Sequence, residues 1–125
     1  MKSYSGSCHC KAVRFRFTSD EITSGCRCNC SICIRRGYVM SSERIPPSAF
    51  ELDGEESLAV YQFGDKAMYH YFCKTCGICP FSAVASLPEN YEGRAKIGDR
   101  RVNLGCVDGL DPLALEIEIL DGRSF

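Results

Sequence analysis

The sequence predicts a mainly β domain in which clusters of cysteines tie short strands together. Hydrophobic and polar residues alternate at every second position in several segments, as in strands buried on one face. Asp-Gly and Gly-Asp pairs recur between these segments and indicate turns. The chain also has 10 cysteines in 125 residues, and seven of them fall into three short clusters. We therefore expect one domain, residues 1–125, with short strands, metal-binding knuckles and little helix.

The first predicted strand contains Val13, Phe15 and Phe17, which alternate with arginine and threonine. Two runs rich in aromatic residues, 58–63 and 67–72, predict a pair of strands. The sequence Gly-Asp-Lys between these runs is typical of a hairpin turn.

Two later runs, 101–104 and 115–120, also predict strands. In the second run Leu115, Ile117 and Ile119 alternate with glutamates. The helical signal is weak: residues 31–36 predict one or two turns, and residues 48–50 predict one short turn after two prolines.

Composition limits the classes of protein to which the chain can belong. Hydrophobic residues make up 45% of the sequence, which excludes a disordered chain, and the net charge is -1. Such a charge gives no general attraction to nucleic acid or to an anionic membrane. No apolar run approaches the ~18 residues of a membrane span, and the first residues do not resemble a signal peptide. We expect a cytoplasmic protein, whose reducing surroundings favour metal sites over disulfides.

The three cysteine clusters have the spacing of metal ligands. They are Cys8 and Cys10 in a C-x-C motif, Cys28, Cys30 and Cys33 in C-x-C-x-x-C, and Cys73 and Cys76 in C-x-x-C-G. Zinc is bound tetrahedrally: four thiolates close a structural site, whereas three leave one position open to water or substrate. A C-x-C disulfide, by contrast, would close a strained ring.

Two assignments of the seven thiols remain open at this point. In one, the first and third clusters form a closed site with four cysteines and the middle cluster forms an open site with three. In the other, the middle cluster recruits a fourth ligand and both sites are structural. In the first assignment, a zinc ion would join strands distant in sequence, and metal binding would then contribute directly to folding.

The remaining cysteines and both histidines are predicted not to bind metal. Cys26 would share a strand face with Cys28, but such positions are about 6.8 Å apart, whereas sulfurs on one zinc are ~3.7 Å apart. We expect Cys79 and Cys106 to be buried apolar thiols. His9 is expected on the surface or beside the metal shell, and His70 is expected to pack within a strand.

Two arginines, Arg35 and Arg36, follow the middle cluster directly. A solvated surface pair is one interpretation. The other is that they neutralise thiolate charge or hold an anionic substrate.

Together, the motifs resemble one family over nearly the whole chain. The segments that carry the resemblance are Gly6-Ser7-Cys8-His9-Cys10, Cys28-Asn29-Cys30-Ser31-Ile32-Cys33, Cys73-Lys74-Thr75-Cys76-Gly77 and Val102-Asn103-Leu104-Gly105-Cys106. In this order they resemble the glutathione-dependent formaldehyde-activating enzymes, whose domain is similar to that of centromere protein V. Lys11 departs from the glycine that is usual after the first motif, and Ile34 from the usual basic residue after the second.

The resemblance implies a β-tent fold of small stacked antiparallel sheets with zinc knuckles. It also implies the first assignment of ligands: Cys8, Cys10, Cys73 and Cys76 on a structural zinc, and Cys28, Cys30 and Cys33 on a catalytic zinc. The implied activity is that of a carbon–sulfur lyase, which joins glutathione and formaldehyde in S-hydroxymethylglutathione.

The working hypothesis is therefore a cytoplasmic zinc enzyme with a small-molecule thiol such as glutathione as its partner, and no membrane or nucleic acid. The alternative is a non-catalytic zinc module that binds a protein or nucleic acid. That alternative would rely on a local patch of arginines, which are Arg14, Arg16, Arg35, Arg36, Arg100 and Arg101.

Overall fold

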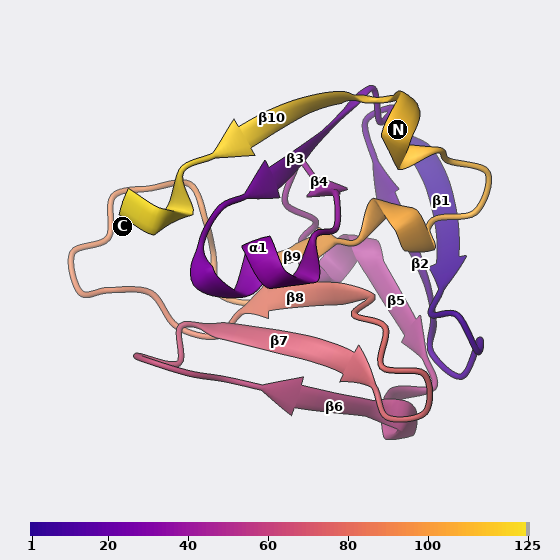
Figure 1. Ribbon diagram of the computed structural model, residues 1–125, viewed down its shortest axis with the longest axis horizontal. Coiled ribbons are helices and arrows are strands. Elements are labelled where there is room, and N and C mark those ends of the chain that lie inside the picture. Colours follow the sequence, from indigo (N-terminus) through magenta and orange to yellow (C-terminus); the bar gives the residue numbers. More distant parts are fainter. Residues whose placement is uncertain (125) are drawn as a thin grey trace.

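The computed structural model describes residues 1–124 and contains three small sheets that surround a common core (Figure 1). The first sheet has the order β1-β2-β5, with β1 at Lys2–Ser7, β2 at Arg14–Ser19 and β5 at Phe50–Asp53. The second has the order β10-β3-β4, with β10 at Glu116–Leu120, β3 at Ser24–Cys28 and β4 at Met40–Ser41. The third has the order β6-β7-β8-β9, with β6 at Leu58–Tyr61, β7 at Met68–Cys73, β8 at Phe81–Val84 and β9 at Arg100–Val102.

Helical structure in the described residues is limited to one α-helix and short 3-10 turns. Helix α1 is Ser31–Arg36, the range that the sequence predicts, and it ends at Gly37 in the left-handed conformation, with φ of 65°. The 3-10 turns are Pro47–Ala49, Glu55–Ser57, Leu104–Cys106, Pro112–Ala114 and Gly122–Ser124. The predicted class, mainly β with small sheets and little helix, is thus confirmed.

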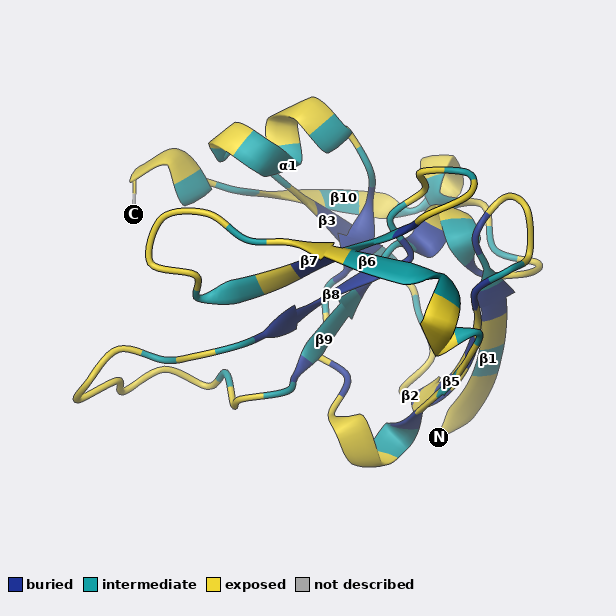
Figure 2. Ribbon diagram, turned by 90° about the horizontal axis from the view of Figure 1, so that it is seen from below, coloured by how far each residue is buried: buried dark blue, intermediate teal, exposed yellow. Residues whose placement is uncertain are grey.

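Aromatic side chains form much of the core between the sheets, and Figure 2 shows β8 among the buried segments of the chain. Phe15 and Phe17 point inward from β2 because every second residue of a strand faces the same side. Phe15 stacks on Phe50 with ring centroids 5.6 Å apart, and Phe50 meets Phe81 of β8 at 4.8 Å. The alternation that predicts the first strand is therefore the alternation that builds the core.

Three details differ from the sequence prediction. Strand β10 pairs with β3 in parallel, whereas we expected antiparallel sheets throughout. The predicted strand 101–104 ends at Val102, because Asn103 caps a 3-10 turn by accepting a hydrogen bond from the Gly105 backbone. Strand β6 ends at Tyr61, two residues earlier than expected.

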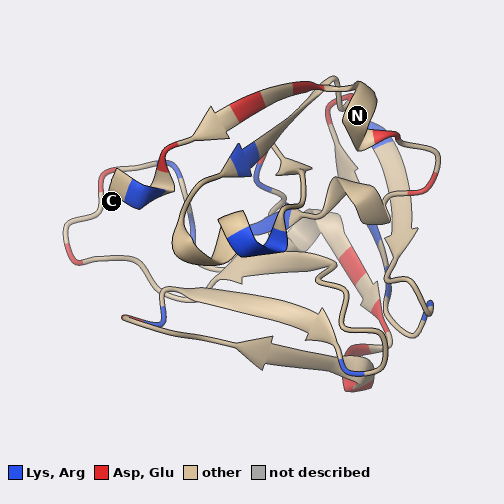
Figure 3. Ribbon diagram, in the orientation of Figure 1, with Lys and Arg blue, Asp and Glu red and all other residues tan. Residues whose placement is uncertain are grey.

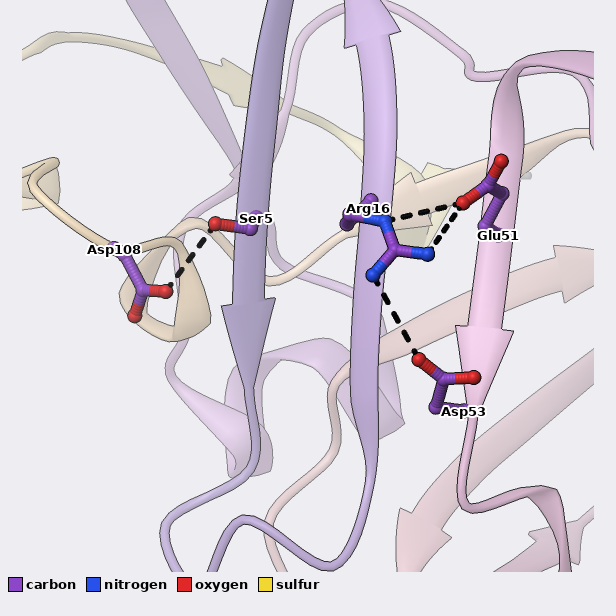
Figure 4. Close-up of polar contacts among 5 residues, drawn as sticks. All are labelled: Ser5, Arg16, Glu51, Asp53 and Asp108. Atoms are coloured by element: carbon purple, nitrogen blue, oxygen red, sulfur yellow. Dashed lines mark hydrogen bonds and ion pairs between the residues drawn. The ribbon is translucent and has the colours of Figure 1, made fainter.

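The outer face of the first sheet carries exposed polar contacts (Figure 4). Arg16 of β2 donates to Glu51 of β5 at 2.7 Å and lies 3.8 Å from Asp53. Ser5 of β1 donates to Asp108 at 3.4 Å. Solvent screens exposed pairs of this kind, so the buried aromatic layer dominates the stability of this sheet.

Candidate metal centres

The first metal centre joins two segments that are far apart in the sequence. Cys8 and Cys10 lie in the loop after β1, Cys73 is the last residue of β7, and Cys76 lies in the turn that follows. The sulfur of Cys10 is 3.7 Å from that of Cys8 and 3.6 Å from that of Cys73. Four sulfurs at roughly 2.3 Å from a shared zinc would be roughly 3.7 Å apart. This spacing fits a tetrahedral metal and is much longer than a disulfide bond.

Backbone N–H groups point at these sulfurs and favour their charged form. The amide of Val13 donates to Cys8 Sγ and that of Thr75 to Cys73 Sγ, both at 3.4 Å. Burial raises the pKa of Cys76, but hydrogen bonds from the backbone of Cys10 and Ile78 outweigh it, so this pKa falls to about 6. A backbone hydrogen bond at Ala12 lowers the pKa of Cys10, but burial and the thiols of Cys73, Cys8 and Cys76 outweigh it and raise this pKa to about 11. Four thiolates this close therefore need a bound cation to remove their mutual repulsion.

Two tight turns bring the four sulfurs together. Gly77 has φ of 79°, in the left-handed region that glycine adopts most easily. Lys11 has φ of 67°, which explains why glycine would suit that position. Cys8 is 2% exposed and Cys73 is 0% exposed, and both pack against Val13. One side of the first centre thus forms part of the core, whereas Cys76 is half-buried and Cys10 is exposed.

The second centre is built at the junction of β3 and α1. Cys28 ends β3, Cys30 is the N-cap of α1 and Cys33 lies within the helix. Their three sulfurs lie within 4.8 Å of one another, and each residue is only partly buried. The Cys30 amide donates to Cys28 Sγ at 3.4 Å.

Electrostatics at the second centre favour a bound cation. Burial, together with the adjacent thiols of Cys30 and Cys28, raises the pKa of Cys33 far above its ordinary value. Three thiolates this close repel one another, and a divalent cation removes that repulsion. The donor set and its spacing therefore fit a zinc ion with three protein ligands.

The carboxyl-terminal segment packs directly behind the second centre. Asn29, between two of the cysteines, donates through Nδ2 to Asp121 and accepts at Oδ1 from the Arg123 amide, both at 2.9 Å. A Cβ atom at Gly122 would lie only 2.4 Å from Cys28 Sγ. Sequence reasoning missed this role of residues 121–123, because their only local signal is that of a turn.

Comparison with known proteins identifies one family. The family model described as glutathione-dependent formaldehyde-activating enzyme matches residues 3–119. The chain belongs to this family. A crystal structure of a Rhodobacter sphaeroides protein is similar, with a TM-score of 0.74 and 29% sequence identity over 93% of this chain and 99% of that chain.

The other cysteines lie outside both centres, as expected, but they are not all simple apolar thiols. Cys26 is buried, donates to the Ser41 carbonyl at 3.6 Å and accepts from Arg101 at 3.3 Å. The prediction for Cys79 is wrong: it is only partly buried, and Arg36 Nη1 donates to its sulfur at 3.0 Å. Cys106 is also only partly buried, and burial raises its pKa to about 12.

Both histidines occupy the places expected of them, away from the two groups of sulfurs. His9 is exposed between two cysteines of the first centre. His70 is buried in β7 and stacks on Phe63 with centroids 5.6 Å apart. Burial, together with the charge of Arg36, lowers the pKa of His70 to about 4.

The arginines do not gather into one surface patch (Figure 3). Arg16 faces acidic side chains on β5. Arg100 lies over the Phe50 ring at 5.0 Å, and Arg101 donates to the Ser41 carbonyl at 2.8 Å. Arg35 and Arg36 both lie on α1, beside the second centre. No helix of the described residues is long and apolar enough to cross a bilayer.

Proposed function

We propose that this protein is a zinc-dependent enzyme of the carbon–sulfur lyase type, which acts on a glutathione-like thiol and an aldehyde. It would form or cleave an S-hydroxymethyl thiol adduct. The proposal rests on one observation, the unequal number of sulfurs in the two centres. Four cysteines enclose one centre, whereas the three cysteines of the other are partly exposed beside a cavity of about 480 Å³.

We assign a structural zinc to Cys8, Cys10, Cys73 and Cys76 and a catalytic zinc to Cys28, Cys30 and Cys33. Four sulfurs complete a tetrahedral shell at the first site, so a zinc ion there would keep no coordination position for a substrate, although Cys10 is exposed. The three cysteines of the other site border the cavity through Cys30. A small molecule in this cavity would therefore lie beside the site whose three cysteines leave a coordination position free.

A zinc ion in the second site supplies a coordination position for a thiol and lowers the pKa of that thiol. The reaction forms one carbon–sulfur bond: the thiol loses its proton, the sulfur attacks the aldehyde carbon, and the carbonyl oxygen takes up a proton. The thiolate is the nucleophile in such additions. In this scheme the protein holds the sulfur close to the aldehyde, which lowers the entropic barrier.

The decisive measurement is zinc stoichiometry with and without excess glutathione, combined with the rate of adduct formation above the uncatalysed background. We expect two zinc ions per chain, of which one responds to glutathione. Cys33→Ala should abolish both the response of zinc binding to glutathione and the catalysed rate of adduct formation, but it should keep one zinc ion. A single zinc that is indifferent to glutathione, with no rate above background, would leave only a structural role for metal.

Cys106→Ala is the matched control for cysteine replacement. Cys106 belongs to neither group of sulfurs, so this variant should keep both zinc ions and the full rate. If Cys106→Ala lost the activity as completely as Cys33→Ala, the assignment of the catalytic ligands would be wrong.

A further inference from the structure

The cavity beside the second centre contains charged groups that the proposed chemistry does not use. It is bordered by Cys30 and carries two arginines, Arg35 and Arg123, and the ring of Phe63. A second cavity of about 300 Å³ shares Arg35 and Phe63 with it and adds Tyr61. Together the two cavities follow one side of α1 and begin at a metal ligand.

The backbone next to Cys30 fixes the Arg35 side chain. Its Nη1 donates to the Ser31 carbonyl at 2.7 Å, one residue from Cys30. A guanidinium group has five N–H donors, so this bond leaves most of them for a ligand. The charge of Arg35 is thereby held at the edge of the cavity.

A different set of bonds holds Arg123 at the same cavity. Its backbone amide donates to Asn29 at 2.9 Å, which ties residue 123 to the loop between two metal ligands. The nearby carboxylate of Asp121 already accepts from Ser124 at 2.6 Å and from Asn29 at 2.9 Å. No ion pair among the described residues involves Arg35 or Arg123.

We propose that Arg35 and Arg123 bind a carboxylate of the thiol substrate while its sulfur reaches the second metal centre. This inference rests on the proposed function and narrows it to thiols that carry an anionic group a few bonds from the sulfur. Arginine suits the task because its planar fork matches the two oxygens of a carboxylate. Uncharged and cationic thiols gain no such contact.

The aromatic side of the cavity fits the rest of such a thiol. Phe63 and Tyr61 stack with centroids 5.8 Å apart and are 42% and 52% exposed. Exposed rings beside a polar centre can cover the carbon chain of a ligand and exclude water from it. The cavity thus offers charge at one end and apolar surface along its length.

The test is calorimetric binding of three small thiols to the zinc-replete protein in the absence of aldehyde. The probes are 3-mercaptopropionate, which is anionic, 2-mercaptoethanol, which is neutral, and cysteamine, which is cationic. We expect 3-mercaptopropionate to bind roughly 10-fold more tightly than 2-mercaptoethanol, since charge-assisted hydrogen bonds are about twice as strong as neutral ones.

Arg123→Gln should remove most of this preference without changing the affinity for 2-mercaptoethanol. The substitution keeps the backbone bond to Asn29, so the loop stays in place. Arg123→Glu should reverse the preference in favour of cysteamine, and Arg35→Gln should act like Arg123→Gln. Arg14→Gln, an exposed change on the first sheet, is the matched control and should have no effect.

The possible failures are distinguishable. Thiols that bind with equal affinity whatever their charge, or a preference that survives both glutamine variants, would overturn the role of the two arginines and leave the proposed function standing. If no thiol binds to the zinc-replete protein, the proposed function and this inference both fail.

Discussion

Gly122 provides a sharp test of the second metal centre, because it lies behind a ligand without being one. A Cβ atom at this position would be 2.4 Å from Cys28 Sγ and 3.1 Å from Cys30 Cβ. Ordinary non-bonded contact begins at about 3.5 Å. In Gly122→Ala the Cys28 sulfur must therefore withdraw by about 1 Å.

A shift of about 1 Å is several times the variation of ~0.2 Å that metal–ligand distances tolerate. We expect the second zinc to bind at least 10- to 100-fold more weakly in Gly122→Ala, as for other changes that disturb ligand orientation. The metal-free protein should fold normally, because an unligated Cys28 side chain can rotate away. Gly122 does not have a positive φ, so alanine introduces no backbone strain there.

The assay is competition between the zinc-replete protein and a chromophoric chelator of graded affinity, which reports the two zinc equivalents separately. In Gly122→Ala, only the affinity for the more weakly bound zinc ion should fall. Gly105→Ala is the matched control, since its Cβ would meet only Asn103 Oδ1, at 3.2 Å. Wild-type affinity for both equivalents in Gly122→Ala would refute the assignment of Cys28 as a ligand.

Three further predictions concern the core and the first centre. Cys73→Ser should lose one zinc equivalent, and added zinc should raise its melting temperature by less than that of the wild type, because the first centre ties β7 to the β1–β2 loop while the second centre still binds. Phe81→Ala should lower the free energy of unfolding by about 3–5 kcal/mol in denaturant titrations, since Phe81 is 1% exposed and packs on Phe50. The pKa of His70 is lowered to about 4 in the folded protein, so the unfolded chain binds more protons between pH 6.5 and 4, and stability falls as the pH falls through this range. His70→Phe should remove about 1–2 kcal/mol of that acid destabilisation, allowing for partial solvent screening, when its pH dependence of unfolding is compared with that of the wild type; equal slopes would contradict the reasoning.

Prediction from sequence succeeded where the signal is local. The alternation around Phe15 places β2 correctly, and the residues between Cys30 and Gly37 form the expected helix. Prediction failed where the structure of a segment depends on contacts with residues distant in the sequence. The short strands β4 and β8 have no clear periodicity of their own, and β8, which lies between β7 and β9, is buried along its whole length. The environment of Cys79 was predicted wrongly for the same reason, since its hydrogen-bond donor Arg36 lies on α1, 43 residues earlier in the sequence.

The candidate site shows the same division. Cysteine spacing predicted the three local clusters, because C-x-C and C-x-x-C turns position their sulfurs over a few residues. That the first and third clusters share a centre was implied only by the resemblance to the family. The spacing could not predict that Asn29 anchors the carboxyl-terminal segment, or that Gly122 and Arg123 reach the second centre. Those contacts span more than ninety residues and follow from the parallel pairing of β10 with β3.

The sequence by itself therefore determined the mainly β class, the three cysteine clusters and the family, since each depends on residue types at short, fixed separations. Only the tertiary structure decided what surrounds those sulfurs. Cys8 and Cys73 anchor one centre in the core, whereas the other lies partly exposed beside a cavity lined by Arg35 and Arg123. The physical reason is that enclosure depends on the packing of distant strands, which no local pattern encodes.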